Sequence, residues 1–485
     1  MTVEERISGL ATDLQQNIGS IRSILGHSSD LNVRELTIGG RLRTALIYLD
    51  GMADVQTIQG YIISPLLELS GQEDISLSML ADHVIQASEV YWAMDLKEAV
   101  EQILAGDLLM LLEGEASGLL ISIAKWEERS VDESKTQPVV KGPQNAFTEN
   151  IRTNTTLVRR RVKHDKVRVA GLRVGKLSKT DVAIMYLEGI ASDQLVAKLI
   201  GSMNNISVDR ILEGEYLEEI LLGNKQFSIF PRFYNTDRPD TIAAGIMEGR
   251  IAVFIDGTPF VLLAPTLFND FLQSAEDYYQ PSLYSSAIRL LRYCSLFICL
   301  FAPALYIALT TFHQDMIPTQ LLISIAGQRE GTPFPSFVEA MLMEITFEIL
   351  REAGIRMPRT IGQAVSIVGT IVIGQAAVEA GIVSAVMVIV VSITAISSFV
   401  IPAYSMAIPV RMIRFGMMGL AASFGVYGLT IGLILLIVHL CHLRSFGMPY
   451  FSPVAPYHRS QMKDALVRFP FRDSKVNKRQ GQGTQ

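Results

Sequence analysis

Charged residues are scarce in the second half of this 485-residue chain, whereas in the first half they recur every few positions. Over the whole chain 49% of residues are apolar and only 19% are charged, so the apolar excess lies in the second half. A net charge of −6, with no basic stripe carrying interleaved aromatics, argues against a nucleic-acid partner. The composition therefore predicts a soluble N-terminal half followed by a membrane-embedded half.

Cysteine is also rare, and this argues against a disulfide framework. The three cysteines, Cys294, Cys299 and Cys441, all lie inside apolar runs and form no C-x-x-C pair. We interpret them as small buried hydrophobic residues. The N-terminus, Met1-Thr-Val-Glu-Glu-Arg-Ile7, lacks the basic region and apolar core of a cleavable secretory signal, so we expect the first half to stay in the cytoplasm.

The motifs of the common catalytic sites are missing as well. The sequence contains no Walker loop, H-E-x-x-H, G-x-S-x-G or Rossmann glycine triplet, which predicts a protein that is not an enzyme and uses no cofactor. His439 and His442 are three residues apart, a spacing that could place two imidazoles on one helix face for a metal ion. Without an evident third ligand, we interpret them as anchors at the membrane interface.

A basic run in the first half has two interpretations. Arg159-Arg-Arg161, with Lys163, Lys166 and Arg168, could contact anionic headgroups of membrane lipids. A solvated helix face explains the same pattern more simply, and we favour it.

Four stretches are long and apolar enough to cross a bilayer, which takes about 20 residues. Arg289 and Arg292 precede the first stretch and indicate a cytoplasmic start. A fifth segment, 337–350, carries Glu339, Glu344 and Glu348, so it either spans with its acids turned inward or lies at the interface. Residues 316–327 are too short to cross and could be re-entrant. The four stretches are 293–312, 361–378, 382–408 and 415–440.

The first half contains an internal duplication. Ile47-Tyr-Leu-Asp-Gly-Met-Ala-Asp54 recurs as Met185-Tyr-Leu-Glu-Gly-Ile-Ala-Ser192, which reads as strand, glycine turn and helix. A helix, glycine cap, strand and hairpin around Gly106 recurs in the same order around Gly249. We therefore predict two similar α/β subdomains, with a cleft between them where a small ligand could sit.

The predicted fold class is an α/β soluble N-terminal half followed by an all-α transmembrane helical bundle of about 4–6 membrane segments. We favour a cytoplasmic C-terminal tail. The predicted order is a polar lead-in (1–34), α/β subdomain 1 (35–126), a linker (127–147), α/β subdomain 2 (148–271), a connector (272–292), the transmembrane domain (293–443) and a basic tail (444–485).

Three carboxylates at four-residue steps form the first candidate site. Glu344, Glu348 and Glu352 share one face of a helix, and a ring of such groups around a common axis would select cations. The alternative is that Glu348 and Glu352 pair with Arg351 and Arg356 at helical spacing. The sequence does not decide between these interpretations.

The next apolar stretch supplies candidates for a gate. A stripe of mostly small residues on one helix face is typical of close packing between helices in lipid. The flanking valines could instead form an apolar constriction that closes a pore by dewetting. The pore-lining or gate candidates are Val365, Val368, Val372, Gly362, Ser366 and Gly369.

Several motifs in the second half resemble the A subunit of the spore germinant receptors, the GerA family. They include Pro318-Thr-x-Leu-Leu-x-Ser-Ile-Ala326, Arg329-Glu-Gly-Thr-Pro-Phe-Pro335 and Phe347-Glu-x-x-Arg-Glu-Ala-Gly-x-Arg-x-Pro358. The resemblance extends from about Glu35 to the end of the chain. The motif residues that it singles out are Arg329, Glu330, Gly331, Pro333, Pro335, Arg351 and Pro358.

The resemblance implies a component of the nutrient sensor in the inner membrane of the bacterial endospore. It implies two partners, a transporter-like B subunit and a lipoprotein C subunit, and a homo-oligomer, thought to be a pentamer, around an ion-conducting pore that opens when germinant binds. A non-conducting scaffold or a solute carrier in the same type of complex is the alternative. Discrete ion steps from purified protein would favour the channel, and saturable substrate-coupled uptake the carrier.

Overall fold

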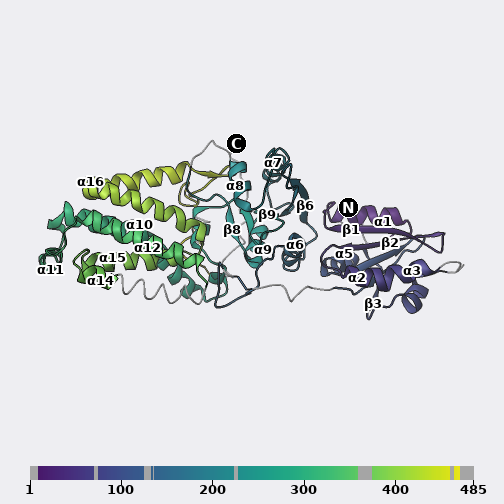
Figure 1. Cartoon of the computed structure of the whole chain (residues 1–485). Coiled ribbons are helices and arrows are strands. Elements are labelled where there is room, and N and C mark those ends of the chain that lie inside the picture. Colours follow the sequence, from purple (N-terminus) through teal and green to yellow (C-terminus); the bar gives the residue numbers. More distant parts are fainter. Residues whose placement is uncertain are drawn as a thin grey trace. The chain divides into compact units, whose positions relative to one another are not determined.

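The chain divides into two compact units in the computed structural model, which describes residues 9–69, 75–124, 133–134, 136–222, 228–358, 374–458, 462 and 464–469 (Figure 1). Unit 1 consists mainly of Met1–Gln226 and Phe233–Pro265, and unit 2 of Phe227–Arg232 and Thr266–Lys475.

Unit 1 contains two five-stranded antiparallel sheets with the same strand order, β1-β2-β4-β5-β3 and β6-β7-β9-β10-β8. The first sheet consists of β1 (Leu31–Ile38), β2 (Leu42–Leu49), β3 (Val90–Ala93), β4 (Leu108–Leu112) and β5 (Gly118–Ile121). The second consists of β6 (Val167–Val174), β7 (Thr180–Leu187), β8 (Tyr234–Thr236), β9 (Ile251–Ile255) and β10 (Val261–Ala264).

Helices follow the same order in both halves of unit 1. The first half has α1 (Leu14–Ile24), α2 (Val55–Thr57), a π-helical stretch (Ile58–Ile63), α3 (Ser64–Glu68), α4 (Leu77–Met79), a second π-helical stretch (Leu80–Val84) and α5 (Leu96–Ala105). The second half has α6 (Ile151–Arg159), α7 (Asp193–Asn204), α8 (Gly214–Leu222) and α9 (Pro239–Met247).

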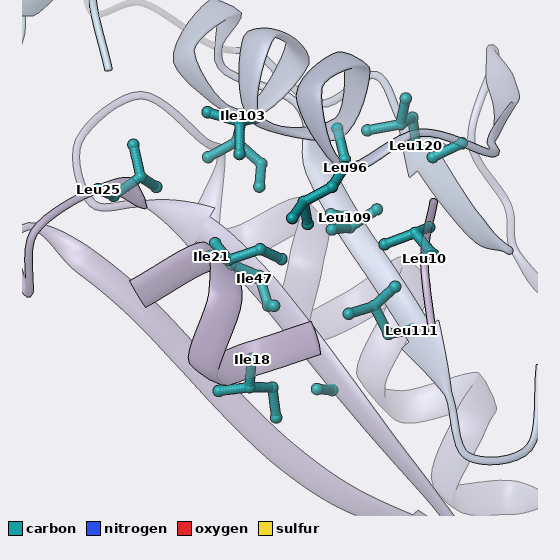
Figure 2. Close-up of a cluster of buried hydrophobic side chains, with 14 of the residues drawn as sticks. Leu10, Ile18, Ile21, Leu25, Ile47, Leu96, Ile103, Leu109, Leu111 and Leu120 are labelled. Carbon is teal, nitrogen blue, oxygen red and sulfur yellow. The ribbon is translucent and has the colours of Figure 1, made fainter. Parts of the chain in front are cut away.

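The first sheet is covered by helices on both faces, and this explains why its central strand β4 is apolar at every position. Ile47, Leu109 and Leu111 pack with Ile21 of α1 and Ile103 of α5 (Figure 2). The neighbouring residues of the same strands point to the opposite face and pack with α3 and the π-helical stretches. Burial of each such side chain stabilises the fold by about 1.5–3 kcal/mol.

Hydrogen bonds repeat between the two halves and support the predicted duplication. The amide of Asn17 in α1 accepts from Ala11 N (2.8 Å) and donates to Ala11 O (2.6 Å). Asn154 in α6 makes the same two bonds with Thr148, at 2.8 and 2.6 Å. Both asparagines are buried and lie four residues after the N-cap residue of their helix. The two halves therefore share their interior polar contacts as well as their strand order.

The positions predicted to be equivalent agree with this arrangement. Tyr48 and Tyr186 are each the second-last residue of their strand, β2 or β7. Burial raises the pKa of both phenols, and a carboxylate two residues later adds to each shift. Gly106 and Gly249 follow α5 and α9 with φ values of 112° and 90°, the left-handed conformation that ends a helix.

The first subdomain begins earlier than the predicted residue 35. Strand β1 starts at Leu31, and α1 contributes the fully buried Leu14, Ile18 and Ile21 to the core of the first sheet. The segment predicted as a polar lead-in therefore contains an integral helix. Its low overall hydrophobicity concealed an apolar stripe at helical spacing, with Asp13 as the N-cap.

Unit 2 is mostly helical. It consists of α10 (Ser282–Thr311), α11 (Thr319–Arg329), α12 (Ser336–Arg356), α14 (Gly374–Glu379), α15 (Ala385–Phe399), α16 (Tyr404–His442), a hairpin of β11 (Arg444–Ser445) and β12 (Met448–Pro449), and short 3-10 turns at Phe268–Leu272, Ala275–Tyr278 and Gln314–Met316. Of the described helices, α10 and α16 are long and apolar enough to cross a membrane.

Helix α16 folds back on itself at Gly425. This residue has φ 61° and ψ −140°, which no α-helix contains. A Cβ atom at Gly432 would lie 2.6 Å from Met417 Sδ, although fifteen residues of straight helix would separate the two by about 22 Å. Residues 404–424 and 426–442 therefore form an antiparallel helical hairpin.

The predicted spans 382–408 and 415–440 are wrong in their boundaries. Helix α15 ends at Phe399 and α16 begins at Tyr404, because Pro402 cannot continue the first helix. Arg411 and Arg414, expected just before a span, lie inside residues 404–424 instead. The predicted span 361–378 lies outside the described residues except for its end in α14.

We expect Gly249→Ala to destabilise unit 1 more than Gly257→Ala. Both glycines have φ near +90°, so each alanine is strained by about 1–2 kcal/mol. Only at Gly249 would the new Cβ lie 2.9 Å from a backbone atom, Ile190 O, whereas Gly257 has no heavy atom within 4 Å. Hydrogen exchange of β9 in the detergent-solubilised protein measures the difference, and equal effects would contradict the predicted clash.

Candidate functional site

The predicted gate lies outside the described residues. Its six positions are Val365, Val368, Val372, Gly362, Ser366 and Gly369, and their role stays a prediction.

Two of the predicted cation-ring residues form ion pairs within their own helix. Glu348 pairs with Arg351 three residues later, and Glu352 Oε1 lies 2.6 Å from Arg356 Nη2. The second pair is exposed, at 60% and 77% of the two side chains, so it contributes little to stability. These contacts are the pairing that the sequence offered as the alternative to a ring.

Glu344 has a partner that the sequence did not predict. Its Oε2 lies 2.8 Å from Arg414 Nη2, and each side chain is only 1% exposed. Removing one member of a buried pair costs about 3–5 kcal/mol, because the remaining charge is left without a counter-ion. Two groups of Arg414, Nε and Nη1, have no hydrogen-bond partner among the described residues. The pair therefore joins α12 to residues 404–424 and favours one position of the two helices along their axes.

Glu348 extends this contact into a cluster. Its carboxylate lies 3.3 Å from Arg411 Nη1 and 3.4 Å from Arg414 Nη2, in addition to the contact with Arg351. Three guanidinium groups thus lie within reach of two carboxylates where α12 meets residues 404–424. The cluster could not be derived from sequence spacing, because its two helices are about 60 residues apart in the chain.

The family motif around residue 330 lies where three helices meet. Arg329 Nε is 3.5 Å from Oε1 of the fully buried Glu339, and Glu339 Oε2 accepts a hydrogen bond from Ser384 N at 2.9 Å. Since Ser384 is the N-cap of α15, the motif arginine helps to tie α11 and α12 to α15.

The other motif residues border these helices. A Cβ atom on Gly381 would lie 3.0 Å from Gly331 O. Pro335 is the N-cap of α12, and Pro358 follows its end at Arg356, positions where proline does not interrupt a helix. Glu330 and Pro333 are exposed.

Arg289 and Arg292, predicted as cytoplasmic anchors of the first span, are buried and pair with a carboxylate of the chain. Arg289 Nε and Arg292 Nη1 lie 3.0 and 2.7 Å from Asp277 Oδ2. Arg289 Nη1 also lies 2.9 Å from Asp464 Oδ1 in the C-terminal region. The phenol of Tyr278 donates to Asp464 Oδ2 at 2.7 Å. The start of α10 and the C-terminal region therefore lie side by side.

His439 contacts the protein and has no metal site around it. Its Nε2 lies 3.0 Å from Ser228 Oγ, and its ring lies 5.9 Å from that of Phe230. No group of three His, Cys, Asp or Glu side chains in the described part of the chain could hold a metal ion. His442 ends α16.

A cavity of about 420 Å³ lies between the two halves of unit 1. Its walls come from the loop after β2, the first turn of α2 and one side of α6. The walls are both polar and apolar and include residues of both signs of charge. The lining residues include Gly51, Asp54, Asn150, Arg152, Thr156 and Arg160.

One buried ion pair holds the two halves together beside this cavity. Arg159 Nε and Nη2 contact the two carboxylate oxygens of Asp30 at 2.8 and 3.0 Å, and Nη2 also donates to Ser28 Oγ at 3.0 Å. Arg159 and Arg168 are buried, so neither belongs to the solvated helix face that the basic run predicted. This bidentate pair fixes α6 against the segment that leads into β1.

We expect Arg159→Ala to loosen the two halves of unit 1, at a cost of about 3–5 kcal/mol, because Asp30 would be left buried and unpaired. The matched control is Arg152→Ala, which removes an exposed pair with Asp50 at 3.1 Å and should cost about 1 kcal/mol or less. Urea unfolding of both variants measures the difference. Similar midpoints would contradict a structural role for the buried pair.

Comparison with known proteins connects this architecture to one family. A model of the Bacillus/Clostridium GerA spore germination protein family matches residues 19–480. Spore germination protein KA of Bacillus subtilis is 44% identical over 471 residues, covering 96% of this chain and 86% of that protein. The uncharacterized membrane protein YfkQ of the same organism is 42% identical, covering 95% and 90%.

One solved structure is also similar to part of the chain. It is the crystal structure of the N-terminal domain of the A subunit of the Bacillus megaterium spore germinant receptor GerK3. It is 33% identical, covers 54% of this chain and 98% of that domain, and has a TM-score of 0.44.

Proposed function

The chain belongs to the Bacillus/Clostridium GerA family of spore germination proteins, and we propose that it is the A subunit of a nutrient germinant receptor. The extent of the match carries this proposal, because the family model covers both the soluble unit and the helical unit. The partners we propose are a transporter-like B subunit and a lipoprotein C subunit. The proposed role is one of sensing and signalling without catalysis.

The proposed location is the inner membrane of the spore, with the N-terminal half on the core side. The two long apolar helices support insertion into a membrane. The contacts of Asp464 with Arg289 and Tyr278 support a C-terminal tail on the side where α10 begins. In this proposal that side also holds the N-terminal half, because only residues 266–281 join unit 1 to the start of α10.

We further propose that several copies of the chain, five in the arrangement implied by the resemblance, surround a pore that conducts ions when germinant binds. The charged cluster of α12 and residues 404–424 supports conduction. Ionisable side chains inside membrane helices are costly, and they commonly mark an ion pathway. Germinant binding on a partner subunit needs to shift a closed-to-open equilibrium by only a few kcal/mol.

A non-conducting scaffold or a solute carrier is the second candidate, since a buried ion cluster also suits a purely structural core. Reconstitution of the full chain with its partner subunits into planar bilayers separates the two. Discrete current steps after addition of nutrients would support the channel. Saturable uptake of a labelled nutrient without current steps, or neither signal, would contradict it.

We expect replacement of a constricting valine to make the resting pore leak. In the helix predicted for residues 361–378, alanine or serine at Val365, Val368 or Val372 would lower the barrier to wetting. Spores that carry such a variant should lose potassium without nutrient. The matched control is Ile367→Ala, which a helical wheel puts on the opposite side of the same helix.

The measurement is potassium release from dormant spores, normalised to the amount of protein in the membrane. If every valine variant is either absent from the membrane or indistinguishable from the control, the pore assignment is wrong. The small-residue stripe would then be a helix-packing surface.

A further inference from the structure

The charges of α12 and of residues 404–424 form two facing ladders. On α12 the carboxylates of Glu344, Glu348 and Glu352 are spaced four residues apart, or about 6 Å along the helix. On the facing segment Arg411 and Arg414 are three residues apart, or about 4.5 Å. Arg414 contacts Glu344 at 2.8 Å and Arg411 contacts Glu348 at 3.3 Å. These contacts run in opposite directions along the chain, so the two helices are antiparallel.

The ladders have unequal length, and this leaves one carboxylate outside the interhelical contacts. Glu352 pairs only with Arg356 of its own helix among the contacts of the described residues, and both side chains are mostly exposed. Such a pair is worth about 0–1 kcal/mol, so it is easily exchanged for a better partner. A shift by one step along α12 would therefore give each arginine a new carboxylate.

Arg414 already lies between two steps of the ladder. Its Nη2 is 2.8 Å from Glu344 and 3.4 Å from Glu348. Because a buried guanidinium is costly without a counter-ion, this double contact keeps Arg414 paired while it exchanges Glu344 for Glu348. Two discrete registers are favoured over a continuous slide because packed helices are bistable, as in known one-turn shifts of packed elements.

We propose that Arg411 and Arg414 are positioning residues that hold α12 and residues 404–424 in one of two registers. In the resting register Arg414 pairs with Glu344 and Arg411 with Glu348. In the shifted register Arg414 pairs with Glu348 and Arg411 with Glu352. This inference rests on the proposed channel function, and it assigns the shifted register to the conducting state.

The shift has a chemical consequence for Glu344. In the resting register its carboxylate is neutralised by Arg414 and shielded, with 1% of the side chain exposed. In the shifted register it loses its counter-ion inside the helical bundle, and water or a monovalent cation must compensate the charge. A conducting cation therefore stabilises the shifted register, and Glu344 becomes available to cations only when the protein is active.

The test compares one chemical change at two steps of the ladder. Glu344→Gln removes the resting partner of Arg414 and should favour the shifted register, so potassium should leave dormant spores about tenfold faster with no nutrient added. Glu352→Gln removes the shifted partner of Arg411 and should slow the response to a mixture of amino acids and glucose about tenfold, with no leak. A tenfold effect corresponds to a bias of about 1.4 kcal/mol. Asp315→Asn, at an exposed carboxylate outside the ladder, controls for loss of a negative charge.

Each outcome decides the proposal. If the carboxylates form a cation ring, both variants should conduct more slowly and neither should leak. If Glu344 and Arg414 form a purely structural pair, Glu344→Gln should reduce the amount of protein in the membrane, and Glu352→Gln should change neither the leak nor the nutrient response. Either result overturns the two-register model. Because Glu352 is exposed, its variant should fold. The nutrient response of Glu352→Gln therefore tests the two-register model even if Glu344→Gln does not fold. If wild-type spores themselves give no nutrient response, the proposed receptor function has failed, whereas a failure of the ladder leaves that response intact.

Discussion

A charge buried among apolar helices must keep a counter-charge within reach, and this constraint sets the arrangement of unit 2. Arg414 with Glu344, Arg289 with Asp277, and Arg329 with Glu339 each satisfy it. Each of these contacts joins separate elements of the chain. Apolar side chains along such helices resemble one another, so packing alone specifies only weakly how far one helix is shifted along its neighbour. The ion pairs supply the specificity, because only certain positions of one helix along another pair every guanidinium with a carboxylate.

Unit 1 satisfies the same constraint with a different architecture. The asparagine bridges at Asn17 and Asn154 show how closely one half repeats the other. The contact between the halves depends on Asp30, whose equivalent in the second half is Lys166, since the backbone carbonyls of these two residues accept equivalent hydrogen bonds. Asp30 and Arg159 come from different positions of the two copies, so the contact between the duplicated halves is asymmetric.

Sequence reasoning predicted the elements that local patterns specify. The apolar runs of β2, β4, β7 and β9, each next to a glycine turn, were sufficient for the α/β class and for the duplication. The place of helix α1 in the core was missed because its apolar stripe is short. The fold-back at Gly425 was missed because five glycines lie within α16, and composition does not show which of them has a positive φ.

The partners of the charged residues were harder to predict. Helical spacing correctly offered Arg351 and Arg356 as local partners of Glu348 and Glu352. The pairing of Glu344 with Arg414 depends on how far two helices that are distant in the sequence are shifted along each other. Both helices carry charged residues three or four positions apart, but no local pattern predicts that these residues face each other.

The ion pairs at the start of α10 have a consequence for synthesis of the protein. Arg289 lies 175 residues before Asp464, its second carboxylate partner. At about 5–20 residues per second, a ribosome needs about 10–35 seconds to complete that interval. During this time Asp277 is the neighbour that can neutralise both Arg289 and Arg292. Helix α10 is therefore synthesised with an incomplete set of ion pairs, and Asp464 completes that set later.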